Sequence, residues 1–75
     1  MSPRLSPRER EVLELASRGL TNAQVAETLS LTTHGVKFHL ASIYRKLGVA
    51  NRTEAAVVYV NGTASESIQV EHAGP

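Results

Sequence analysis

The chain has 75 residues, a formal net charge of +1 and no cysteine, and 41% of its residues are hydrophobic. This length leaves room for one small domain, and the lack of cysteine excludes a disulfide framework and thiolate zinc sites. No apolar run approaches the roughly 20 residues of a membrane span, and the first residues lack the apolar segment of a secretory signal peptide. We therefore expect a cytoplasmic protein.

Charge is distributed unevenly along the sequence. All 8 lysine and arginine residues lie between Arg4 and Arg52, and no acidic residue occurs from Thr28 to Thr53. A local basic surface of this kind suits a polyanion such as nucleic acid, although it also fits an ordinary solvated helix face.

The first predicted helix begins after Ser6. Ser6 and Glu9 form a capping-box pattern, Pro7 suits the first helical position, and apolar residues then recur at helical spacing. Gly19 is the predicted stop. The acidic residues of this helix are expected to lie on a solvated face and to include the capping partner of Ser6. They are Glu9, Glu11 and Glu14.

A second, shorter helix is predicted to begin at Thr21 and to end near Leu29. Thr21 and Gln24 repeat the capping-box pattern, and Thr32 then suits the N-cap of a third helix. Only a few residues join the two helices. This arrangement is the helix-turn-helix pattern.

The third helix is predicted over residues 33–47, because four apolar residues lie on one stripe and Gly48 suits the end. The stripe consists of Val36, Leu40, Ile43 and Leu47. The opposite side and its flanks carry mostly polar and basic residues: His34, Lys37, Phe38, Ala41, Ser42, Arg45 and Lys46. The polar ones can hydrogen-bond phosphates or base edges, and Phe38 and Ala41 can meet the methyl group of thymine. The alternative is that Phe38 packs against the first helix.

A fourth helix is predicted from Asn51, with Glu54 as the partner of the capping residue. The apolar run 55–60 has strand propensity too, but the cap and the lack of a partner strand favour a helix. A second copy of the chain is the natural cover for one face of so apolar a helix, and the alternative is simple exposure of its small alanine and valine side chains. We therefore expect a homodimer with its interface at Ala56, Val57, Val58, Tyr59 and Val60.

The predicted domain comprises residues 1–60. Residues 61–75 are rich in Gly, Ser, Thr and Glu and show no helical period, so we expect them to form a mostly disordered, flexible tail.

Catalysis and metal binding are not expected. His34 and His39 lie about 140° apart around their helix, so they cannot readily share a metal ion. The sequence has no glycine-rich phosphate loop and no cysteine nucleophile. We therefore expect a chain that is not an enzyme and has no cofactor and no metal.

Short motifs occur in a fixed order between residues 5 and 60: Leu-Ser-Pro-Arg-Glu-Arg-Glu-Val-Leu at 5–13, Gly-Leu-Thr-Asn at 19–22, Val-Lys-Phe-His at 36–39, Ile-Tyr-Arg-Lys-Leu-Gly-Val at 43–49 and Asn-Arg-Thr-Glu-Ala at 51–55. Together they resemble the LuxR-type (GerE-like) helix-turn-helix domain of bacterial transcription regulators. The resemblance implies an all-α, four-helix domain that binds double-stranded DNA sequence-specifically and regulates transcription as a dimer.

The resemblance also implies roles for single residues, with helix 33–47 in the major groove. Base contacts are expected from Lys37, Phe38 and Ala41. The resemblance and the positive ends of the helix N-termini together suggest which residues contact phosphates. These are Thr21, Asn22, Thr32, Thr33, His34, Arg45, Lys46 and Arg52. For His39, packing at the edge of the core competes with a phosphate contact. RNA polymerase is a further candidate partner, and no membrane contact is expected.

One residue departs from the family's pattern, because Gly35 stands where threonine is common. Glycine lacks the hydroxyl that could bind phosphate, and it weakens the first helical turn by up to about 1 kcal/mol relative to alanine, so one interpretation is weaker DNA binding. The other interpretation is that glycine lets the backbone approach DNA closely.

Two other functions fit part of the sequence. One is a module similar to region 4 of sigma factors, which contacts a promoter and RNA polymerase. The other is a protein-interaction module that docks a partner on its exposed helix. Because LuxR-type regulators usually carry an upstream sensing domain, the chain is either a stand-alone regulator or a piece of a larger one.

Overall fold

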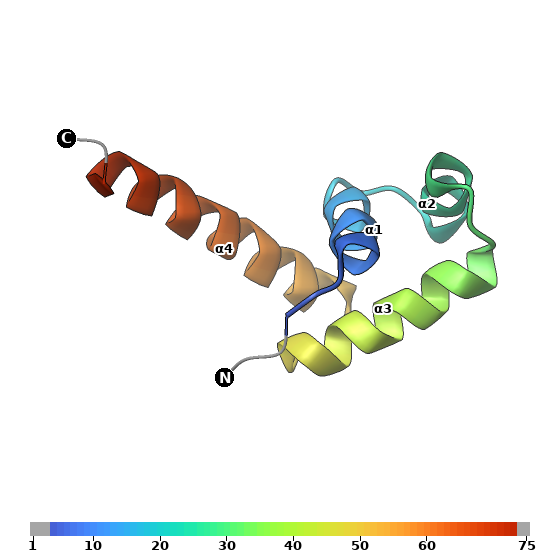
Figure 1. Cartoon of the computed structure of the whole chain (residues 1–75). Helices are drawn as coiled ribbons and strands as arrows, with labels where there is room; N and C mark the ends of the chain where they lie inside the picture. Colours follow the sequence, from blue (N-terminus) through green and yellow to red (C-terminus); the bar gives the residue numbers. More distant parts are fainter. Residues whose placement is uncertain (1–3, 74–75) are drawn as a thin grey trace.

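The computed structural model describes the backbone of residues 4–73 and the side chains of residues 4–62. This part of the chain contains α1 (Pro7–Ser17), α2 (Asn22–Leu29), α3 (Thr33–Leu47) and α4 (Arg52–Ala73), and no strand. The predicted all-α fold with four helices is therefore confirmed. Figure 1 shows α2 and α3 meeting at a tight turn, while α4 extends away from the other helices on the opposite side.

The first two helices begin with the predicted capping boxes. In α1, Ser6 Oγ accepts a hydrogen bond from the Glu9 amide at 3.1 Å, and Glu9 Oε1 accepts one from the Ser6 amide at 2.8 Å. Thr21 and Gln24 form the same reciprocal pair at the start of α2, at 3.1 and 2.8 Å. These bonds satisfy amides that have no partner within the helix, which is why the helices begin there.

The turn between α2 and α3 is short because Ser30 takes a left-handed conformation, with φ of 57°. The next amide, that of Leu31, donates to the carbonyl of Ala26 at 2.8 Å, and the Leu31 side chain packs against the core. Thr32 then caps α3, because its Oγ1 accepts from the Gly35 amide at 2.9 Å. The direction of α3 relative to α2 is therefore fixed within three residues.

Gly48 ends α3 with φ of 70°, as predicted for a glycine after the last turn. At the start of α4, Asn51 Oδ1 accepts from the Glu54 amide at 2.9 Å. The return bond differs from a regular capping box, since Glu54 accepts from the amide of Ala50, at 2.8 Å.

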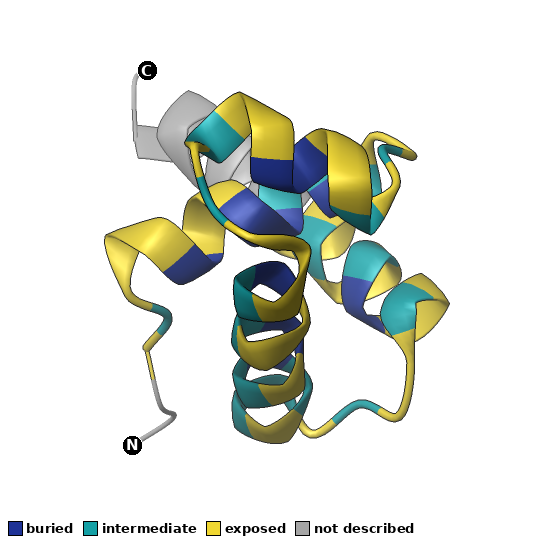
Figure 2. Cartoon of the chain, turned by 90° about the vertical axis from the view of Figure 1, so that its right-hand side faces the viewer, coloured by how far each residue is buried: buried dark blue, intermediate teal, exposed yellow. Residues whose placement is uncertain are grey.

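The core is formed where α1 contacts the other three helices and α3 contacts both α2 and α4. Figure 2 shows exposed residues along the outer faces of the helices and buried residues where the helices meet. The buried apolar side chains are Val12, Leu13, Ala16, Val25, Ala26, Val36, Leu40, Ile43 and Ala55. These include Val36, Leu40 and Ile43 of the stripe predicted for the third helix, whereas its last member, Leu47, is half-buried at the edge of the core.

The fourth helix extends past the end of the predicted domain. The sequence predicts that the domain ends at residue 60, but α4 continues as a helix to Ala73. Gly62 does not stop it, because its φ is not positive and a glycine inside a helix costs only about 1 kcal/mol relative to alanine. The flexibility expected for residues 61–75 stays a prediction, and residues 74 and 75 lie outside the described part.

Candidate nucleic-acid interface

The outer face of α3 is a continuous exposed surface. Each of its residues lies three or four positions from another one, so that together they occupy one side of the helix: His34, Lys37, Phe38, Ala41 and Arg45. Phe38 is 70% exposed, so the alternative that it packs against α1 is wrong. We call these five residues the outer face of α3.

The cations of this outer face are available to an external partner. Within residues 4–62, no hydrogen bond or ion pair engages the side chains of Lys37 and Arg45, and α3 contains no acidic residue. Thr33 and His34 are exposed in the first turn, where helix amides carry partial positive charge. Positive charge thus extends along the helix from its first turn to Arg45.

Ser42 and Lys46 are turned away from this face toward α1. Ser42 Oγ donates to Glu9 Oε2 at 2.7 Å, and Lys46 Nζ donates to Glu9 Oε1 at 2.8 Å. Lys46 also lies 3.5 Å from the carbonyl oxygen of Arg4. Its ammonium group is therefore committed to an internal ion pair, and the phosphate contact expected from it stays a prediction that this geometry does not favour.

The expectation of a solvated face for all three acids of α1 is wrong for Glu9, which is only 5% exposed. Burial would raise the pKa of this carboxyl, but hydrogen bonds from Lys46, Ser42 and the Ser6 amide, with the charge of Lys46, lower it from 4.5 to about 2. Glu9 is therefore ionised inside the domain. The available signal was that Ser42 and Lys46 lie four residues apart beside the apolar stripe of α3.

Asn22 and Arg52 are also engaged within the chain. The Arg52 guanidinium donates to Asn22 Oδ1 at 3.0 Å and to the carbonyl oxygen of Leu20. These bonds tie the start of α4 to the start of α2, a link that the sequence did not indicate. The phosphate contacts expected from Asn22 and Arg52 remain predictions.

The remaining predicted phosphate contacts include two capping threonines. The hydroxyl oxygens of Thr21 and Thr32 accept bonds from the amides of Gln24 and Gly35, but both residues are exposed. A threonine hydroxyl that accepts such a bond still carries a proton to donate to a phosphate oxygen. Capping and phosphate binding are therefore compatible at both positions.

The residues expected at a dimer interface are divided between two sides of α4. Val57 and Val60 are 53% and 56% exposed, and with Ala56 they line a shallow apolar groove bordered by Thr53 and Asn61. We call Ala56, Val57 and Val60 the outer face of α4.

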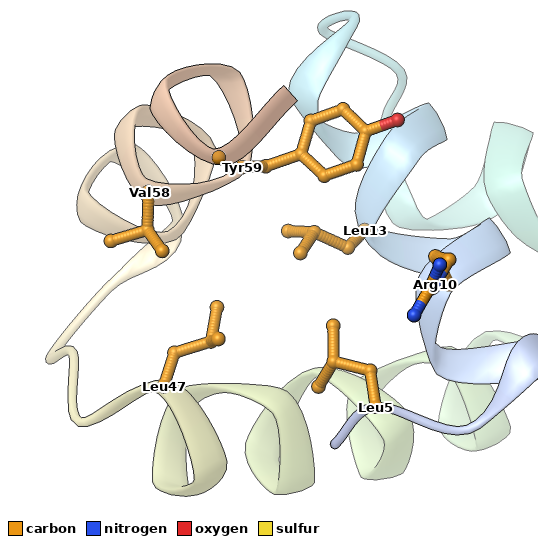
Figure 3. A pocket seen from close by; sticks show the side chains of 7 residues that line it. Leu5, Arg10, Leu13, Leu47, Val58 and Tyr59 are labelled. Atoms are coloured by element: carbon orange, nitrogen blue, oxygen red, sulfur yellow. The ribbon is translucent and has the colours of Figure 1, made fainter. Parts of the chain in front are cut away.

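Tyr59 points the other way, toward its own core. Tyr59 and Val58 line a pocket of about 360 Å³ together with Leu13 and Leu47. Figure 3 shows these two side chains of α4 on the opposite side of the pocket from Leu47 and Leu5. Tyr59 is half-buried, whereas Val58 at the edge of the pocket is 40% exposed. Tyr59 therefore stabilises the monomer, and Val58 lies between the two sides.

Membrane-spanning helices and metal sites are both absent from the part of the chain that the structure describes. No helix there combines the length and the apolar character that a membrane span requires. No group of three or more His, Asp or Glu side chains there could hold a metal ion.

Known proteins resemble this chain in sequence. The family model for bacterial regulatory proteins of the luxR family matches residues 3–59. The transcriptional activator protein BjaR1 of Bradyrhizobium diazoefficiens is 44% identical over 59 residues, which cover 79% of this chain and 24% of BjaR1. The nitrate/nitrite response regulator NarL of Escherichia coli K12 is 42% identical over 53 residues, which cover 71% of this chain and 24% of NarL.

A solved structure shares the fold. The response regulator ChrA of a heme-sensing two-component system superposes with a TM-score of 0.76 at 43% identity, covering 81% of this chain and 30% of ChrA. The chain thus spans less than a third of the length of each of these relatives.

Proposed function

Because the chain belongs to the luxR family of bacterial regulatory proteins, we propose that it binds operator DNA with α3 in the major groove. The chain is a helix-turn-helix domain of a kind that binds DNA and regulates transcription. The observation that carries the proposal is the outer face of α3, which is exposed, basic and without an acidic residue. An α-helix of this kind fits the major groove of B-DNA, which is about 12 Å wide.

Base reading is assigned to the middle of this face. Lys37 is exposed and engaged by no other described residue, so its ammonium group can donate to the N7 and O6 acceptors of guanine. Ala41 follows one turn later, and its small side chain lets the helix approach the base edges closely. Phe38 lies between them on the same face.

Phosphate contacts are assigned to the ends of α3 and to the start of α2. Thr33 and His34 lie at the N-terminus of α3, where backbone amides attract anions, and Arg45 extends from its last turn. Thr21 offers a hydroxyl at the N-terminus of α2, where the first backbone amides of a helix have no partner within it. Such contacts position the domain on the duplex without reading its sequence.

A homodimer through the outer face of α4 is the second part of the proposal. Val57 and Val60 expose apolar surface that the described part of the chain leaves uncovered, and a second copy would cover it symmetrically. Two domains joined in this way would bind half-sites about 34–36 Å apart, one turn of DNA.

The longer relatives support a role for the whole protein. We infer a regulator that binds chromosomal DNA in the cytoplasm, with a binding role rather than a catalytic one. RNA polymerase is the further partner that an activator such as BjaR1 suggests.

Selection of bound duplexes from a random pool, at two salt concentrations, tests the function. We expect enrichment of a common half-site and a steep loss of affinity as salt rises, because phosphate contacts release counterions. A docking module for proteins would show neither result. Retention of no duplex, or equal retention of every sequence, would overturn the proposal.

A further inference from the structure

We propose that Phe38 reads the 5-methyl group of a pyrimidine, so that the protein distinguishes thymine and 5-methylcytosine from pyrimidines that lack this group. The inference rests on the proposed function and names one feature of the operator that the function alone does not specify. It assigns a specificity-determining role to Phe38, whose side chain is the most exposed large apolar one within residues 4–62.

The position of Phe38 leaves most of its ring open to a partner. The side chain is 70% exposed in the middle of the outer face of α3. Its described aromatic neighbour is His39, whose ring stands at 76° to it with the centroids 6.2 Å apart. This edge contact holds one side of the phenyl ring and leaves the rest uncovered.

The surroundings of Phe38 indicate which partner covers it. Lys37 precedes it in the chain and Arg45 lies two turns later, and no described residue pairs with either cation. An apolar protein surface would leave these charges without a counterion. The major groove offers phosphates at its borders and methyl groups on its floor, and therefore suits both kinds of side chain.

The methyl group is the one apolar feature that distinguishes bases in this groove. It projects from C5 of thymine, and 5-methylcytosine carries it at the same position, whereas cytosine and uracil do not. A phenyl ring has no donor with which to read base edges, but it gains by removing a methyl group from water. Ala41, one turn along, leaves space for the ring to reach the groove floor.

Replacing single thymines by uracil in the selected duplex tests the inference, because this change removes only the methyl group. At one position in each half-site we expect the full chain to bind the uracil duplex about fourfold more weakly, the effect of losing one buried methyl group. A duplex with 5-methylcytosine at this position should likewise be bound more tightly than one with cytosine, by a similar factor.

Variants of Phe38 identify the residue that reads the methyl group. In Phe38→Ala the ratio of thymine to uracil affinity should fall to about one, and in Phe38→Leu, which keeps an apolar side chain, part of the ratio should remain. Circular dichroism melting serves as the folding control, and the exposure of Phe38 predicts unchanged melting.

The outcomes separate the two proposals. Sequence-specific binding with equal affinity for thymine and uracil at every position would overturn the methyl inference and leave the DNA-binding function intact. A ratio that persists unchanged in Phe38→Ala would also overturn it, since another residue would then read the group. Failure to bind any duplex would instead overturn the proposed function.

Discussion

Lys46 Nζ lies 2.8 Å from Glu9 Oε1, and this ion pair joins the last turn of α3 to the first turn of α1. The same carboxylate accepts a hydrogen bond from Ser42 and completes the capping box with Ser6. One buried anion therefore begins α1 and holds the C-terminal half of α3 against it. The orientation of the outer face of α3 depends on this contact.

Acid should destabilise the domain through Glu9. Its pKa is about 2 in the folded protein and 4.5 when unperturbed, so its contribution to stability is present above pH 4.5 and is lost as the pH falls toward 2. We expect this loss to be about 1–3 kcal/mol, because Lys46 is partly screened by water. Urea denaturation at a series of pH values measures it.

The variant Glu9→Gln should be less stable at pH 7 and should flatten the stability profile between pH 4.5 and 2. Glu11→Gln is the matched control, because Glu11 lies on the same helix with its side chain 55% exposed in a surface ion pair. It should leave the profile nearly unchanged. A Glu9→Gln profile as steep as that of the wild type would contradict the role given to Glu9.

Lys37 and Lys46 should respond differently to substitution by alanine. Lys37→Ala should change stability by less than about 0.5 kcal/mol and lower affinity for the selected duplex by about 1–3 kcal/mol, because Lys37 is exposed on the outer face. Lys46→Ala should lower the free energy of unfolding by about 1–3 kcal/mol, because it leaves Glu9 buried without a cation. Urea denaturation and fluorescence anisotropy measure the two effects.

The salt dependence of affinity distinguishes the assignments for Lys46. If Lys46 acts only within the domain, the alanine variant keeps the wild-type slope of affinity against salt once it is folded. A flattened slope with unchanged stability would instead support the phosphate contact that the sequence suggests for Lys46.

The beginnings and ends of the helices could be predicted because their signals are local. Ser6, Thr21 and Thr32 each bond an amide three residues away, and Gly48 takes a left-handed conformation that few other residues favour. Helical spacing likewise identified the apolar stripe of α3, and the residues on the opposite side of the helix gave most of its exposed face.

The contacts between helices could not be predicted, because they join residues far apart in sequence. Glu9 and Lys46 are 37 residues apart, and Asn22 and Arg52 are 30 apart. Their side chains are typical of exposed, charged or polar positions, so helical spacing placed them at the surface. Only the packing of α1, α2 and α4 around α3 shows that they bond one another.

Gly35 allows a test of the cap of α3. A Cβ at this position would lie 3.1 Å from Thr32 Oγ1, so the capping hydroxyl would have to move by a few tenths of an ångström. Gly35→Ala should therefore stabilise the domain by less than about 0.5 kcal/mol, although helix propensity alone favours alanine by up to about 1 kcal/mol. In a Thr32→Ala background the gain should approach the full value.

A double-mutant cycle measured by urea denaturation reveals this coupling between Gly35 and Thr32. Thr32→Ala alone should cost about 1 kcal/mol through loss of the cap. Equal gains from Gly35→Ala in the two backgrounds would mean that the close contact has no energetic effect.

The outer face of α4 is the proposed dimer contact. Val57→Glu should leave the monomer folded, because Val57 is 53% exposed, but it should place a charge at the centre of the proposed dimer contact. Affinity for a duplex with two half-sites should fall on the order of tenfold to a hundredfold as cooperativity is lost. Affinity for a single half-site should not change. Tyr59→Glu would be a poorer test, since Tyr59 packs in its own core.

Val57→Ala is the control for this substitution, because it keeps the contact apolar and should retain most of the cooperativity. Electrophoretic mobility shifts on duplexes with one and two half-sites compare the three proteins directly. Lengthening the spacer by half a turn should weaken the wild type as Val57→Glu does, since two joined domains require half-sites on one side of the DNA. If Val57→Glu binds the two-site duplex as cooperatively as the wild type, the dimer contact does not lie on this face of α4.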